Sequence, residues 1–63
     1  MTTRHTIETQ ATPDMPCSTI QLHGFSLVSI KERYNAITHP STRLWVYNAD
    51  NKLIARRRNG SWS

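Results

Sequence analysis

Residues 43–58, RLWVYNADNKLIARRR, contain two β-rich runs separated by a polar turn, and this stretch decides the fold. The runs cover 44–47 and 53–57, with NADN at 48–51 between them. Asn48 can accept hydrogen bonds from the turn backbone, and Asn51 tolerates the left-handed conformation that a G1 bulge requires. The pattern therefore predicts a β-hairpin over about 43–57.

The predicted hairpin register pairs three residues of each strand: Tyr47 with Leu53, Trp45 with Ala55 and Arg43 with Arg57. In this register one face, expected to pack on a helix, carries Trp45, Tyr47, Leu53 and Ala55. The other face carries Leu44, Val46, Lys52, Ile54, Arg56 and Arg58. A shift of one residue would exchange the two sets, because successive side chains of a strand point to opposite faces.

A helix is predicted over about 26–38. Ser26 is a suitable N-cap, and Pro40 disfavours helix at the residue before it. An apolar stripe at spacings of three, four and three is formed by Leu27, Ile30, Tyr34 and Ile37. A competing interpretation makes 25–30 a strand, because Phe25 also alternates with serine. Residues 18–23, STIQLH, alternate weakly and predict a third strand beside the hairpin.

The remaining chain sets the domain organisation. Residues 1–17 are rich in Thr and Pro and predict a flexible N-terminal tail, with a short strand near 6–9 as the minor alternative. Residues 18–63 then form a single small domain. The expected fold class is α+β, with one helix packed on a two- or three-stranded antiparallel sheet.

The small core predicts a weak homodimer. The chain has 63 residues, of which 37% are hydrophobic, and a chain of about 60 residues buries only ~60% of its unfolded surface. A second copy could complete the core, and the apolar side chains expected on the outer hairpin face are Leu44, Val46 and Ile54.

A cytoplasmic location is expected from cysteine content and hydropathy. The single cysteine, Cys17, excludes an internal disulfide and fits a reducing compartment. No run approaches the ~20 apolar residues that cross a bilayer, and residues 1–17 lack the apolar segment of a signal peptide. We therefore expect no membrane association.

The charge of the chain is concentrated in the hairpin. Its five cations against one anion, Asp50, equal the net charge of +4 of the whole chain. The candidate contact residues are Arg43, Lys52, Arg56, Arg57, Arg58 and, in the short C-terminal tail, Trp62.

Three interpretations fit this charge. In the first, the arginines contact nucleic-acid phosphates or base edges, and Trp45, Tyr47 or Trp62 stacks on unpaired bases. In the second, the cationic strand docks on an acidic protein, or adds to the sheet of a host factor that it modulates. In the third, the charges simply solvate an edge strand and prevent aggregation.

Enzymatic and metal chemistry are not expected. The histidines His5, His23 and His39 lack ligand spacing with each other and with Cys17. Glu32 is a helix-surface charge and Asp50 a turn former, and neither has a catalytic partner in sequence. A core this small also seldom encloses a pocket. We therefore expect no catalytic residue, metal or cofactor.

The order of elements resembles that of short uncharacterised enterobacterial proteins of the YkfF type, which prophages and plasmids encode. The similarity covers about residues 25–58 and rests on three motifs: FS at 25–26, YNAIT at 34–38, and RLWVY at 43–47 with the turn at 48–52. It departs at Asn51, where the family pattern carries glycine, and at the three arginines that end the second strand. The resemblance implies an α+β fold and a mobile-element origin, and it brings no mechanism or functional residue.

Overall fold

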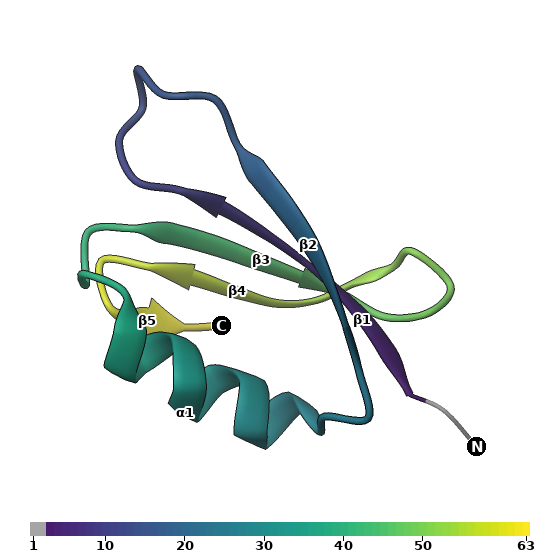
Figure 1. Cartoon of the computed structure of the whole chain (residues 1–63). Coiled ribbons are helices and arrows are strands. Elements are labelled where there is room, and N and C mark those ends of the chain that lie inside the picture. The colour runs from purple at the N-terminus through teal and green to yellow at the C-terminus, as the bar shows by residue number, and fades with distance from the viewer. Residues whose placement is uncertain (1–2) are drawn as a thin grey trace.

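The computed structural model describes residues 3–63 and shows one helix on one face of a five-stranded antiparallel sheet (Figure 1). The elements are β1 Arg4–Gln10, β2 Ser18–His23, α1 Leu27–Ile37, β3 Arg43–Tyr47, β4 Leu53–Arg58 and β5 Ser61–Trp62. The strand order across the sheet is β2-β1-β3-β4-β5. The α+β class is therefore confirmed, whereas the sheet has five strands instead of two or three.

Strand β1 lies inside the sheet, between β2 and β3 (Figure 1). Its residue Ile7 pairs with Ile20 on one side and Val46 on the other, and is only 1% exposed. The predicted flexible tail is therefore wrong for residues 4–10, where the short-strand alternative holds. Residues 1 and 2 of that tail lie outside the described residues. The strand predicted at 18–23 is present as β2. Its predicted place beside the hairpin is wrong, because β1 lies between β2 and β3.

Helix α1 begins and ends near its predicted positions. The Oγ of Ser26 accepts a hydrogen bond from the backbone N–H of Ser29 at 3.2 Å, so the predicted N-cap is confirmed. Of the predicted stripe, Ile30 and Tyr34 are buried and Leu27 packs at the margin of the core. Ile37 is 63% exposed, so the last residue of the stripe does not belong to the core.

The predicted turn of the β3–β4 hairpin is present. The Oδ1 of Asn48 accepts hydrogen bonds from the backbone N–H groups of Asp50 at 2.9 Å and Lys52 at 3.0 Å. Asn51 has a φ of 60°, which is the left-handed conformation expected of it. The side chain of Asn48 thus holds the turn closed.

Replacing Asn48 with alanine is expected to lower the free energy of unfolding by about 1 kcal/mol, the usual net value of such hydrogen bonds. Urea unfolding followed by circular dichroism measures the change. Asn51→Gly is the matched control, because glycine adopts a positive φ without strain, and it should leave stability unchanged or higher. Equal losses in the two variants would contradict the role of the Asn48 side chain.

The register of the hairpin differs from the prediction beyond the first pair. Tyr47 does oppose Leu53, but a β-bulge follows, so Val46 opposes Ala55 and Trp45 opposes Arg56. The bulge arises because Ile54 is an extra residue in β4, and its insertion exchanges the two faces of β3. The predicted inward position is therefore wrong for Trp45, Tyr47 and Leu53, which is 48% exposed, and confirmed for Ala55, which is 3% exposed.

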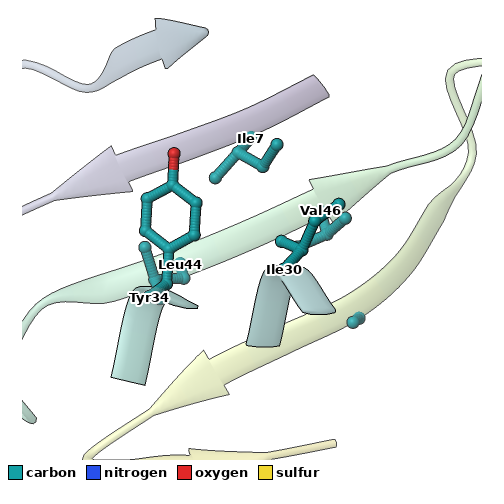
Figure 2. Packing of buried hydrophobic residues seen from close by; sticks show 6 residues of the cluster. Ile7, Ile30, Tyr34, Leu44 and Val46 are labelled. Carbon is teal, nitrogen blue, oxygen red and sulfur yellow. The ribbon is translucent and has the colours of Figure 1, made fainter. Parts of the chain in front are cut away.

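The core lies between α1 and the sheet (Figure 2). It consists of Ile7, Ile30, Tyr34, Leu44, Val46 and Ala55. Leu44 and Val46 are both 0% exposed, so these two residues of the predicted homodimer face are covered by α1. Ile54, the third, is 39% exposed and does not share their face. In the described part of the chain, no helix has the length and apolarity that a membrane span requires.

Candidate nucleic-acid interface

The sheet face opposite α1, here called the open face, carries the outward side chains of the strands. Side chains alternate along a strand, and the buried positions of β1, β3 and β4 face α1. The open face therefore carries the intervening residues, which are Arg4, Thr6, Glu8, Gln10, Arg43, Trp45, Tyr47, Ile54, Arg56 and Arg58. Its charged members are four arginines and one glutamate.

Trp45 lies at the centre of the cationic part of this face. A shallow pocket of about 140 Å³ is lined by Trp45 together with Arg43, Arg56, Arg57 and Arg58. Trp45 pairs with Arg56 on the β4 side and with Glu8 on the β1 side. The Trp45 side chain is half-buried, whereas Arg56 and Arg58 are exposed. Sequence reasoning had assigned Trp45 to the core, and the bulge moves it to this pocket.

The other end of the open face carries Tyr47 and Arg4. Tyr47 follows Trp45 by two residues and pairs with Thr6 of β1. The Nη2 of Arg4 donates to the backbone carbonyl of Ala49 at 2.8 Å, which holds this guanidinium beside the β3–β4 turn. Sequence reasoning missed Arg4 because the tail prediction covered it. The alternation of 4–10, RHTIETQ, was the available signal.

Arg57 was predicted to contact a partner, but its side chain is only 2% exposed and lies on the α1 side of the sheet. Its Nη1 donates to the carbonyl of Tyr34 at 3.4 Å and to Asn35 Oδ1 at 3.0 Å. Its Nη2 donates to three oxygens around the end of α1: Thr38 Oγ1 at 2.7 Å, His39 O at 2.9 Å and Thr42 O at 3.1 Å.

The surroundings of Arg57 explain why a charge is held there. The carbonyl of Tyr34 lies in the last turn of α1, at the negative end of the helix dipole. The carbonyls of His39 and Thr42 follow the helix, and the guanidinium supplies donors to all three in a planar fork. Burial still lowers the pKa of Arg57. Arg57 therefore holds the end of α1 against β4, and the prediction of a surface contact is wrong for this residue.

Trp62 also lies on the α1 side of the sheet, opposite Arg57 in the β4–β5 pair. Its Nε1 donates to Asn35 Oδ1 at 3.1 Å, the same oxygen that Arg57 contacts. Lys31 Nζ lies 5.4 Å and Arg57 Cζ 6.0 Å from the centroid of its ring. Trp62 thus packs against α1, on the opposite face from Trp45.

Lys52, the remaining predicted contact residue, is exposed beside the turn. It lies six positions before Arg58, which corresponds to about 20 Å of extended chain at ~3.3 Å per residue. Of the six predicted residues, the structure brings together Arg43, Arg56 and Arg58 on the open face. It separates Lys52, Arg57 and Trp62 from that cluster.

Within residues 3–63, no group of three or more His, Cys, Asp or Glu side chains is arranged to hold a metal ion. No protein-family profile matches this chain, and no curated protein or solved structure shows significant similarity to it.

Proposed function

We propose that this protein binds nucleic acid through the open face of its sheet. The observation that carries the proposal is the cluster of Arg43, Arg56 and Arg58 around one shallow pocket. Glu8 is the single carboxylate among the open-face residues, so this face has a net positive charge. Such a surface attracts polyanions, and guanidinium groups suit phosphate oxygens.

The arginine cluster supplies affinity through counterion release. Each phosphate that a protein neutralises releases condensed cations, and log K then falls with log[salt] by about 0.7 per phosphate for a single strand. Three contacts would give a slope of about −2. A fourfold rise in salt would then weaken binding about 20-fold.

On the resemblance to the YkfF-type proteins, we further propose that the protein is a cytoplasmic accessory protein of a mobile element. The alternative is a protein that modulates a host factor through the same arginines. The Arg-bearing half of β4 pairs with β3 on one side and β5 on the other, so it has no free edge to add to a partner's sheet. An acidic protein surface is therefore the form of the alternative that the structure leaves open.

The test compares two double variants that remove equal charge. Arg56→Ala with Arg58→Ala should weaken binding of a 12-nucleotide mixed-sequence oligonucleotide in fluorescence anisotropy and reduce the salt slope by about 1.4. Arg33→Ala with Lys52→Ala removes two exposed cations outside the cluster and should change both quantities less. Equal effects of the two double variants, or none, would contradict the proposal. Retention of one protein partner after nuclease treatment, with no oligonucleotide binding, would favour the modulator.

A further inference from the structure

We infer that the ligand of the open face is single-stranded nucleic acid, with an unpaired base stacked on Trp45. This inference rests on the proposed function and narrows it to one class of nucleic acid. Two features of the structure carry it: the place of Trp45 in a central strand, and the different chemistry of the two strands that flank it.

The width of the sheet disfavours a duplex. Trp45 lies on β3, the middle strand of the order β2-β1-β3-β4-β5. Neighbouring strands are about 4.8 Å apart, so the five strands span about 19 Å. The major groove of B-DNA is about 12 Å wide and admits a helix or a two-stranded ribbon. An aromatic ring in the middle strand therefore cannot reach base edges inside that groove.

The aromatic spacing suits separated bases. Trp45 and Tyr47 lie on the same face two residues apart, which is about 6.8 Å along a strand. Successive bases in a duplex strand are about 3.4 Å apart, and neighbouring bases cover their π-faces. An unpaired strand can turn its bases outward and stack them on aromatic rings. The two half-buried rings thus form platforms for bases that are not stacked on each other.

The strands beside Trp45 differ in charge and orient the ligand. On the β4 side Arg56 is its direct partner, with Arg58 two residues further on. On the β1 side its partner is Glu8, whose carboxylate repels phosphate and accepts hydrogen bonds from base amino groups. The sugar-phosphate chain should therefore run along β4, with the edge of the stacked base directed toward β1.

The test compares four probes on the intact protein: a 12-nucleotide DNA, an RNA of the same sequence, the DNA duplex, and an abasic DNA strand of equal length. The abasic strand keeps the phosphates and lacks the bases. Loss of one stacked base should weaken its binding about 5- to 150-fold relative to the intact DNA, and the duplex should also bind more weakly than the better-bound single strand. Because this comparison needs no substitution, it does not depend on the folding of a variant.

Substitutions of Trp45 test whether the base stacks on the ring of this residue. Trp45→Ala should weaken binding of the intact single strand and leave binding of the abasic strand unchanged, whereas Trp45→Phe should restore much of the loss. Equal binding of all four probes, together with weakening by the double variant of Arg56 and Arg58, would overturn the single-strand inference and leave nucleic-acid binding intact. No binding of any probe would overturn both.

Discussion

Replacement of Arg57 with alanine is expected to lower the free energy of unfolding by about 3 to 5 kcal/mol, because it removes several hydrogen bonds to a charged group, worth about 1.5 to 3 kcal/mol each, and empties a buried position. The guanidinium is 2% exposed and donates to three backbone carbonyls and two side-chain oxygens around the end of α1. Without it the carbonyl of Thr42 loses this donor, and the carbonyls of Tyr34 and His39 keep only the backbone N–H groups of Thr38 and Thr42. Buried acceptors with too few donors cost free energy.

The neighbours of Arg57 supply matched controls for urea unfolding. Arg56→Ala and Arg58→Ala truncate exposed side chains and should change stability by less than about 0.5 kcal/mol each. A domain of this size has roughly 3 to 9 kcal/mol of stability, so Arg57→Ala should remove a large part of it. Arg57→Lys keeps the charge without the planar fork and should lie between the alanine variant and the wild type. Similar small losses at all three positions would show that Arg57 is not a buried anchor.

Leu44→Ala is expected to lower the free energy of unfolding by about 3 kcal/mol, because it empties a fully buried position beneath α1. Figure 2 shows Leu44 beside Tyr34 in the core. Trp45→Ala removes a larger side chain, but a half-buried one on the open face, and should cost about 1 kcal/mol.

A comparison of the stability lost in Leu44→Ala with that lost in Trp45→Ala tests the register of the hairpin directly. Thermal unfolding followed by circular dichroism gives both values. If the tryptophan variant lost more stability than the leucine variant, the hairpin would have the register predicted from sequence, with Trp45 beneath the helix. The same measurement shows whether Trp45→Ala keeps the fold that the binding experiments require.

The helix and the hairpin turn were predictable because their signals are local. Ser26 lies at the N-cap and Pro40 lies just beyond the C-terminus of α1, and these signals do not depend on the rest of the fold. The same is true of Asn48 and Asn51, whose side-chain and backbone preferences act within four residues. These elements matched the prediction closely for that reason.

Strand β1 was harder to predict because its inward positions are unusual. His5, Ile7 and Thr9 alternate toward α1, and Ile7 is the only large apolar residue among them. The strand is stabilised by neighbours on both sides, and one of them, β3, comes from a distant part of the sequence. A short stretch of sequence around β1 does not include β3, so the stabilisation that β1 gains from pairing with β3 cannot be inferred from that stretch.

The geometry of the candidate site depends on a single extra residue in β4, Ile54. The predicted register already placed Arg57 on the same face as Ala55, and the bulge at Ile54 changes which β3 residues share that face. Large aromatic side chains usually favour the core, so Trp45 was assigned there in preference to Leu44. The bulge reverses both assignments, which is why the charge of the site was predictable and its geometry was not.

The central position of β1 also governs how the chain reaches its native state. The β1–β2 and β3–β4 hairpins join segments that are close in sequence, whereas the seam between them joins residues as distant as Thr6 and Tyr47. Closing a longer loop costs more chain entropy, so we expect the hairpins to form early and the seam late. Docking of two preformed hairpins would then limit the folding rate. The same docking event would bring Glu8 beside Trp45, so the proposed binding surface would be complete only after the slowest step.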